Sequence, residues 1–323
     1  MRKLLFLATF LVILTASAGA AWIPLAGGEV GHEPTITVLE TDSQHTVFSV
    51  EIPGLYMESD RIGNNVFHHV TVPGSGHDQQ VGAPAVPRVV FEIAVPDLGG
   101  VEIRELSRST TKLAGYIPYP VQEATTDADV PGDVVMDHEL YASRNSYPSQ
   151  TIKVSDPMIW RDVRFVNATL FPVTAEVASK SLTAASQITF EVVYTDGQGI
   201  NPKIRRDFGV SPRLESMYRN ALVNYDSLNL AIEDSRDSNV QYLIIADDSL
   251  MASIQPLADW HMQTGIYTEV VAVSTIGTTA AQIKAFIQNY YDNENTEYVL
   301  LVGEVNTVPL GNTSGDPGDY EYQ

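Results

Sequence analysis

Three short apolar runs decide the fold of the last third of the chain: QYLIIA at residues 241–246, YTEVVAV at 267–273 and YVLLV at 298–302. Runs this short, rich in β-branched residues, are typical of strands that are buried on both faces of a parallel sheet. Segments with helical character lie between them. This alternation predicts the beginning of an open parallel α/β sheet, whose crossovers should be right-handed.

The two helical segments have recognisable ends. The first should run to about Thr264 and end at the C-cap residue Gly265, with a break near Ser253 that puts Pro256 in its first turn. The second follows a threonine cap and repeats apolar residues at helical spacing. Its residues are Thr278 or Thr279 as the cap, then Ile283, Phe286, Ile287 and Tyr290 on one face.

The region before residue 200 has a different texture, with a period of two and frequent Pro and Gly. Alternation of this kind, punctuated by turn formers, predicts short antiparallel strands in a β-sandwich or barrel. The expected strands are residues 35–40, 46–52, 65–72, 88–95, 101–106, 164–172 and 187–194.

A polar, mixed segment separates the two textures. It carries one expected short helix around residues 213–223, then an acidic run at 233–237. We interpret it as an exposed connector, in which Arg205, Arg206 and Arg236 are candidate processing sites. The expected division is a signal peptide at residues 1–20, a β-rich domain at 21–200, the connector at 201–239 and an α/β domain at 240–323.

The N-terminus has the pattern of a secretory signal peptide. Arg2 and Lys3 precede an apolar run at residues 4–14, and Ala18-Gly19-Ala20 fits the small-x-small rule for cleavage after Ala20. We therefore expect export. No later run reaches the roughly 18 apolar residues that a membrane span needs, so no membrane partner is predicted.

Composition excludes several function classes. The chain contains no Cys and has a formal net charge of −21. The first fact excludes thiol catalysis, disulfides and cysteine-ligated metal within these residues, and the second disfavours nucleic acid as a partner. Three strands with their helices enclose little core, so we expect the α/β domain to be incomplete, as in a fragment of a longer protein.

The α/β region resembles the start of the catalytic domain of gingipain-type cysteine peptidases, whose fold is similar to that of caspases. The most specific pieces are Leu257-Ala258-Asp259-Trp260 with Gly265, and residues 298–303 followed by Pro309. Asp319 and Tyr320, with Tyr322, also match. Upstream, residues 82–87 (GAPAVP) and 93–96 (IAVP) are similar to the β-rich propeptide of the same family.

This resemblance implies a zymogen whose propeptide covers the substrate cleft of its own catalytic domain. It also implies peptide substrates and a Cys/His dyad, which would lie beyond Gln323, so no catalytic residue is assigned here. No cofactor is required by that chemistry. His261 occupies a helix position where the family commonly has a basic residue, and we predict it at the surface. The family is bacterial, secreted or at the cell surface.

Four acidic residues are candidates for the cleft edge or for a calcium site, although no metal is assigned. Asp247 and Glu304 follow strands at the edge where parallel sheets bind ligands, and relatives usually have Asp in place of Glu304. Asp316 and Asp319 lie in a loop of oxygen-bearing residues, which suits calcium. The alternatives are helix capping for Asp247, a cap or loop hydrogen bond for Glu304, and an ordinary surface turn for the loop.

One rival hypothesis of another class is kept: a non-catalytic exported binding or adhesion protein, with a β-sandwich and a degenerate α/β module. The absence of Cys favours it, and the stop in the middle of a fold argues against it. Genomic sequence downstream would separate the two, because a continuing frame with a His and a later Cys would establish the enzyme.

Overall fold

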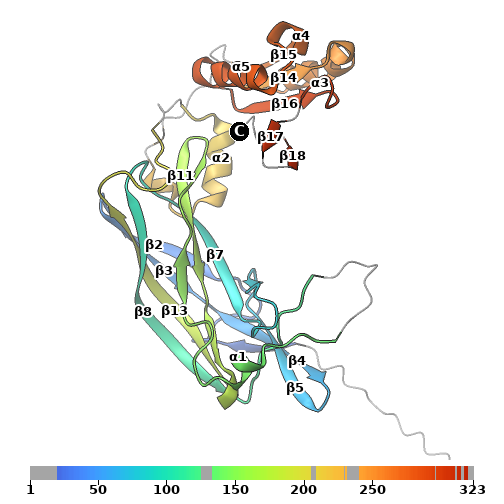
Figure 1. The fold of residues 1–323 in the computed structure, drawn as a ribbon. Helices are drawn as coiled ribbons and strands as arrows, with labels where there is room; N and C mark the ends of the chain where they lie inside the picture. Colours follow the sequence, from blue (N-terminus) through green and yellow to red (C-terminus); the bar gives the residue numbers. More distant parts are fainter. Residues whose placement is uncertain are drawn as a thin grey trace, which may run out of the picture. The chain divides into compact units, whose positions relative to one another are not determined.

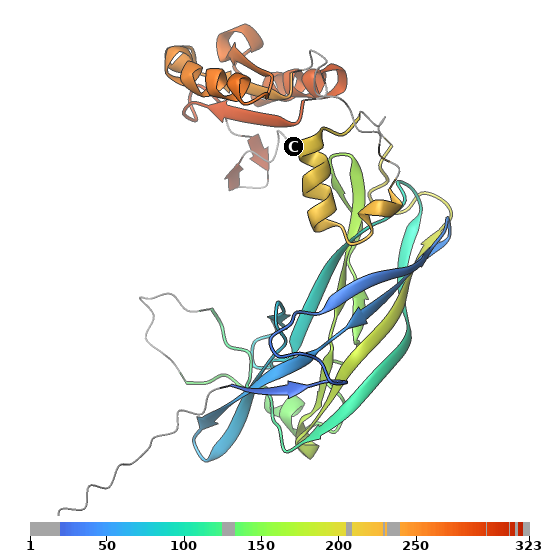
Figure 2. The same ribbon diagram turned by 180° about the vertical axis from the view of Figure 1, so that it is seen from behind.

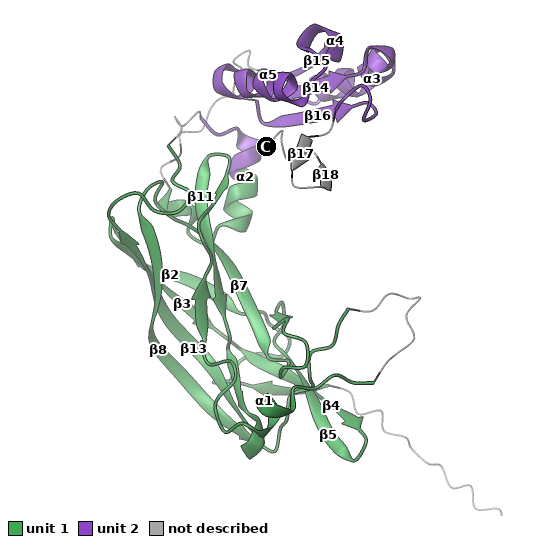
Figure 3. Ribbon diagram, viewed as in Figure 1, with its two compact units in different colours: residues 1–207, 216–229 green, residues 208–215, 230–323 purple. Residues whose placement is uncertain are grey.

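The computed structural model describes residues 20–124, 133–204, 209–228, 230, 240–294 and 296–309, and the backbone of 311–313 and 316–318. The chain forms two compact units, coloured separately in Figure 3. Unit 1 comprises residues 1–207 and 216–229, and unit 2 comprises residues 208–215 and 230–323. The chain is β-rich with a smaller α/β part, as the sequence predicts.

The described residues of unit 1 form three antiparallel sheets (Figure 1). The first has the order β1 (Ala21–Pro24), β4 (Gly54–Ile62), β5 (Asn65–Thr71). The second has the order β10 (Met158–Trp160), β11 (Val163–Leu170), β7 (Pro87–Ala94), β6 (Gly76–His77), and β9 (Ile152–Val154) also pairs with β11. The third has the order β12 (Val173–Glu176), β13 (Ser181–Thr195), β3 (His45–Glu51), β2 (Thr35–Thr41), and β8 (Gly100–Ala114) also pairs with β13.

The sheets of unit 1 share one apolar core. Phe48 on β3 stacks on Phe190 on β13 with ring centroids 5.2 Å apart, and both are fully buried. Ile93 on β7 and Val166 on β11 belong to the same cluster. Figure 2 shows the third sheet from behind, with β2 and β3 in blue. Facing antiparallel sheets around a shared core are the sandwich arrangement that the period-two pattern predicts. The short helices α1 (His138–Ala142) and η1 (Val177–Ser179) complete the unit before the connector.

All seven strands expected in this region are present, as β2, β3, β5, β7, β8, β11 and β13. Their lengths were less predictable. β8 has 15 residues because it pairs with β13 along its whole length, and its polar second half gains its structure from that pairing rather than from alternation. β4 was not expected, because Pro53 and Gly54 at its start are typical of a turn.

Unit 2 contains a parallel sheet in the order β15 (Thr268–Ala272), β14 (Tyr242–Ala246), β16 (Tyr298–Val302). Helices α3 (Met251–Gln263) and α5 (Ala280–Asn293) cover opposite faces. Leu243 and Ile245 of β14 pack with Ile283 of α5, whereas Ile244 packs with Ala258 of α3. A strand buried on both faces by alternate side chains explains why its sequence is continuously apolar.

The helix predictions for unit 2 are confirmed in part. Thr279 caps α5 in a capping box with Gln282, so the second of the two proposed caps is the one used. The expected break near Ser253 is wrong: α3 begins at Met251, after the 3₁₀ turn η3 (Asp248–Leu250), and Pro256 lies inside it. Proline removes one hydrogen-bond donor, and a single missing bond does not end a helix that is packed against a sheet.

The remaining elements are α2 (Pro212–Ala221), η2 (Tyr225–Ser227), α4 (Val273–Ile276), β17 (Gly311–Thr313) and β18 (Asp316–Gly318). Among the described residues, no helix is both long and apolar enough to span a membrane.

Candidate functional site

The carboxyl edge of the parallel sheet in unit 2 carries acidic residues on two neighbouring strands. The first crossover runs from β14 to β15, and the second returns past β14 to β16 on its other side, so the direction of winding reverses at β14. In open α/β sheets this reversal point, at the carboxyl ends of the strands, is where ligands bind. Asp247 directly follows β14, and Glu304 follows β16 after Gly303. The topology therefore brings the two sequence-predicted residues to the same edge of the sheet.

Asp247 acts as a local cap. Its Oδ1 accepts hydrogen bonds from the Ser249 backbone N–H at 2.7 Å and from Ser249 Oγ at 2.5 Å. Hydrogen bonds from Ser249, and then one from the Thr307 side chain, hold the pKa of Asp247 below its usual value. The neighbouring Asp248 accepts a bond from Ser274 Oγ at 2.5 Å, which ties the ends of β14 and β15 together. The capping alternative thus describes what Asp247 does in this structure.

Glu304 takes part in a loop through its backbone. Its carbonyl accepts hydrogen bonds from the N–H groups of Thr307 and Val308, at 2.9 and 2.8 Å, while its side chain is exposed. In the described part of the chain, neither Asp247 nor Glu304 belongs to a group of three side chains close enough to ligate one ion. The side chains of Asp316 and Asp319 lie outside the described residues, so a calcium site in that loop stays a prediction.

His261 is buried, and its prediction as a surface residue is wrong. Its exposed fraction is 9%, and its ring stacks on Tyr242 with centroids 4.4 Å apart. Ile254, Ala258 and His261 recur at i, i+4 and i+7, so His261 lies on the face of α3 that packs against the sheet. This spacing was available in the sequence. The neighbouring Trp260 is the exposed residue, at 56%.

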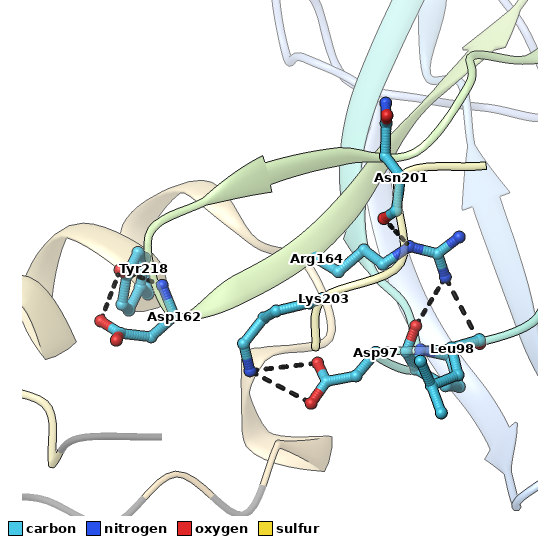
Figure 4. Close-up of polar contacts among 8 residues, drawn as sticks. Asp97, Leu98, Asp162, Arg164, Asn201, Lys203 and Tyr218 are labelled. Atoms are coloured by element: carbon cyan, nitrogen blue, oxygen red, sulfur yellow. Dashed lines mark hydrogen bonds and ion pairs between the residues drawn. The ribbon is translucent and has the colours of Figure 1, made fainter. Parts of the chain in front are cut away.

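A second site lies in unit 1, where polar side chains attach the connector to the β-sheets (Figure 4). Arg164 on β11 has an exposed fraction of 0%, and its guanidinium donates to five backbone carbonyls. Those carbonyls belong to Pro96, Leu98, Gly99, Ile200 and Asn201, with the shortest bonds at 2.7 Å. Burial lowers the pKa of Arg164, and the nearby Asp97 charge opposes that shift. One side chain thus joins the β7–β8 loop to the chain that follows β13.

Lys203 strengthens the same attachment. Its Nζ lies 3.1 Å from Asp97 Oδ2, and its backbone N–H donates to the Asp97 carbonyl at 2.8 Å. The Lys203 side chain is 5% exposed, whereas that of Asp97 is 45% exposed. The carboxylate of Asp97, which stays in partial contact with water, therefore compensates the charge of the buried Lys203 ammonium.

The C-terminal half of α2 is held in a different way. Tyr218 is fully buried, and its hydroxyl lies 3.1 Å both from Asp162 Oδ2 and from the Trp160 carbonyl. Burial raises the pKa of Asp162, while Arg161, at 2.5 Å, and then Tyr218 act against that shift. Burial also raises the pKa of Tyr218, so its hydroxyl stays protonated and able to donate.

Asn224 completes the attachment after α2. Its side-chain amide accepts from the Ala94 N–H at 2.8 Å and donates to the Ala94 carbonyl at 2.9 Å, so it extends the edge of β7. The Val223 N–H donates to the Glu92 carbonyl at 3.1 Å. Residues 216–228 are consequently part of unit 1, and the side chains of Tyr218, Leu222 and Tyr225 are buried rather than exposed. The sequence signal for this burial is a helical spacing of apolar residues at i, i+4 and i+7, namely Tyr218, Leu222 and Tyr225.

Comparison with known proteins agrees with this two-part organisation. The sequence model of the C25 propeptide matches residues 27–229, and that of peptidase family C25 matches residues 235–323. The chain belongs to the C25 peptidase family. This result confirms the resemblance to gingipain-type peptidases, with a propeptide part followed by a peptidase part.

Individual C25 relatives are distant in sequence. Gingipain R2 of Porphyromonas gingivalis strain W83 is 22% identical over 299 residues, which cover 91% of this chain and 40% of the relative. Lys-gingipain of the same species is 27% identical over 267 residues, which cover 78% of this chain and 15% of the relative. The chain thus spans two fifths or less of the length of these relatives.

Part of the fold is also found in a solved structure, the complex of the Porphyromonas gingivalis RgpB pro- and mature domains. The match has a TM-score of 0.54 at 19% identity and covers 61% of this chain and 100% of the matched one. The C25 propeptide match ends one residue after Leu228, the last residue described in the attachment after α2. The candidate processing residues Arg205, Arg206 and Arg236 lie outside the described residues.

Proposed function

We propose that this chain is the N-terminal part of a secreted cysteine endopeptidase zymogen, in which unit 1 keeps the peptidase part latent. The observation that carries the proposal is the order of the two C25 matches, propeptide before peptidase, along one continuous chain. Residues 1–20 would direct export and be removed after Ala20, and β1 begins at the next residue, Ala21.

The catalytic residues for peptide-bond hydrolysis would lie outside the 323 residues of this sequence. A Cys thiolate would attack the scissile carbonyl, a His would transfer the proton, and backbone N–H groups would stabilise the oxyanion. This reaction needs no cofactor. Asp247 and Glu304, at the carboxyl edge of the sheet, would shape the rim of the substrate cleft, with a peptide as the partner.

The attachments in unit 1 separate the candidate processing residues into two groups. In sequence, Arg205 and Arg206 lie between Lys203 and Tyr218, both of which are held by unit 1. Arg236 comes after Leu228, the last residue of the attachment in the described part of the chain. After a cut at Arg206, Lys203 before the cut and Tyr218 after it would both still be bonded to the propeptide unit. We place the separating cut at Arg236, so the domain boundary would lie close to that residue.

The decisive experiment uses the complete reading frame. The zymogen would be expressed with the Cys predicted downstream either intact or replaced by Ala, and peptide hydrolysis would be followed before and after processing. The proposal expects activity only with the Cys and only after processing, and a new N-terminus immediately after Arg236. A frame that encodes no such Cys and His would overturn it in favour of the binding protein.

The processing step has a matched control within the chain. Arg236→Gln should keep the propeptide covalently attached, whereas the double change Arg205→Gln and Arg206→Gln should leave the separation of the two parts unchanged. The products would be resolved by mass spectrometry. Normal separation in the Arg236→Gln variant would exclude that residue as the site and leave the zymogen proposal standing.

A further inference from the structure

Unit 1 contains a cavity of about 500 Å³ that is remote in sequence from the connector. It lies between the turn that follows β1 and one face of the third sheet, and it is open to solvent. Small-ligand sites typically have volumes of about 300–1,000 Å³. The cavity is therefore large enough for one amino-acid side chain together with its backbone.

The turn that forms one wall is fixed by backbone contacts. The Leu25 N–H donates to the Pro53 carbonyl at 2.8 Å, and the Gly28 N–H donates to the Leu25 carbonyl at 3.0 Å. Gly28 lies so close to Pro53 that an added Cβ would be 2.2 Å from the Pro53 carbonyl oxygen. Glycine at this position thus allows the turn to pack down beside the cavity.

The floor of the cavity is a row of polar side chains across four strands. Gln187 on β13 is in register with Ser109 on β8 and with Glu51 on β3, and Glu51 is in register with Thr35 on β2. Residues in register on neighbouring strands project from the same face of the sheet. A hydroxyl, an amide, a carboxylate and a second hydroxyl therefore line the cavity side by side.

The charge of the lining is one-sided. Glu29 and Glu51 supply carboxylates, and neither Lys nor Arg is among the lining residues. Glu29 Oε2 lies 3.3 Å from His32 Nε2, with both side chains largely exposed. Within the described ranges, the Glu51 carboxylate has no ion pair and accepts no hydrogen bond. A cavity with these charges favours a cationic occupant.

The spacing of the two carboxylates that line the cavity does not favour a metal ion as the occupant. A metal ion needs its ligand atoms about 2.0–2.6 Å from one centre, and hence close to one another. Among the described residues, three such atoms gather only at Glu40, Asp42 and His45, which do not line this cavity. A guanidinium is larger, and its five N–H donors suit separated acceptors. Leu25, Ile52 and Pro53 supply apolar contacts for a methylene stem.

We propose that this cavity binds the basic side chain, Arg or Lys, of an extended peptide segment. The carboxylate of Glu51 receives the cationic group, Gln187 and the row of hydroxyls accept further hydrogen bonds, and Glu29 adds attraction at the rim. This binding is independent of peptidase activity and does not rest on the proposed zymogen function.

The test uses residues 21–323 and two probes that differ in charge. N-acetyl-arginine methylamide and its neutral citrulline counterpart would be titrated and followed by NMR and calorimetry at low and high salt. The arginine probe is expected to bind about tenfold more tightly, because a hydrogen bond to a charged group is worth more than a neutral one. Its affinity should fall with added salt, since the site is open to solvent.

Two matched variants assign the binding to the cavity. Glu51→Gln should weaken the arginine probe about tenfold and leave the citrulline probe unchanged, whereas Glu58→Gln, at an exposed position on β4, should change neither. Both positions are on the surface, so thermal melting should show intact folding. Equal binding of the two probes, no binding at roughly 10 mM, or full affinity in Glu51→Gln would each overturn the proposal.

Discussion

The two units satisfy their polar groups at strand ends in opposite ways. In unit 1, Arg164 bonds to carbonyls that lie 36 to 68 residues away in the sequence, so a single side chain joins the β7–β8 loop to the start of the connector. In unit 2, Asp247 accepts two hydrogen bonds from Ser249, only two residues on, and one from the more distant Thr307. Long-range bonding makes the first site part of the fold, whereas the mainly local bonds of Asp247 leave its carboxylate at the surface of unit 2.

The largest expected effect comes from removing the buried guanidinium. Arg164→Met should destabilise unit 1 by about 3–5 kcal/mol, because several carbonyls lose their donor inside the protein. Urea unfolding of residues 21–323, followed by circular dichroism, measures the change. Arg104→Met, at a side chain that is 58% exposed, is the control and should cost less than about 1 kcal/mol. Equal midpoints in the two variants would contradict the role given to Arg164.

A smaller effect is expected at the attachment of α2. Tyr218→Phe removes a hydroxyl that contacts Asp162 and Trp160, and should cost about 1–2 kcal/mol. The loss should also increase the rate of proteolysis between residues 204 and 228, because α2 detaches more often. Tyr267→Phe, at a 44% exposed residue, is the matched control. Unchanged proteolysis in Tyr218→Phe would show that the helix is held mainly by its apolar face.

A local bond in unit 2 should have a local effect. Thr279→Ala removes the capping box of α5 and should destabilise unit 2 by about 1 kcal/mol, while the neighbouring Thr278→Ala should have little effect. Hydrogen exchange of the α5 amides distinguishes the two variants. If both substitutions increase exchange equally, the cap is shared between the two threonines.

The smallest effect concerns pH. A hydrogen bond from Arg108, and then its charge, hold the pKa of Glu105 below its usual value. A lowered pKa contributes stability that is present above the unfolded-state value near 4.5 and is lost as pH falls through the folded-state value. Between about pH 5 and pH 3, the Glu105→Gln variant should lose less unfolding free energy than the unmodified protein. The difference should be under about 1 kcal/mol, because the Glu105–Arg108 pair is partly accessible to solvent. Glu102→Gln, at a side chain that is 56% exposed, is the control. Identical pH profiles of stability for the two variants would show that Glu105 does not contribute to the pH dependence.

Prediction from sequence succeeded where the signal is repeated along the chain. The strand runs and the apolar face of α5 each depend on several residues with one period, and both are present. It failed for isolated polar residues. His261 was predicted at the surface because the family commonly has a basic residue there, whereas its helical spacing with Ile254 and Ala258 places it on the buried face of α3.

The sequence alone determined the division into a β-rich and an α/β region, the order of the elements and the family. Periodic burial and family motifs depend on residues that are close together in the chain, so both can be recognised without the structure. Only the tertiary structure decided that Arg164 bonds to carbonyls of two distant loops and that Tyr218 and Asn224 hold the connector to unit 1. It likewise brought Ser109, Gln187, Glu51 and Thr35 into one row. Those contacts depend on strand register between segments far apart in the chain, which no local pattern encodes.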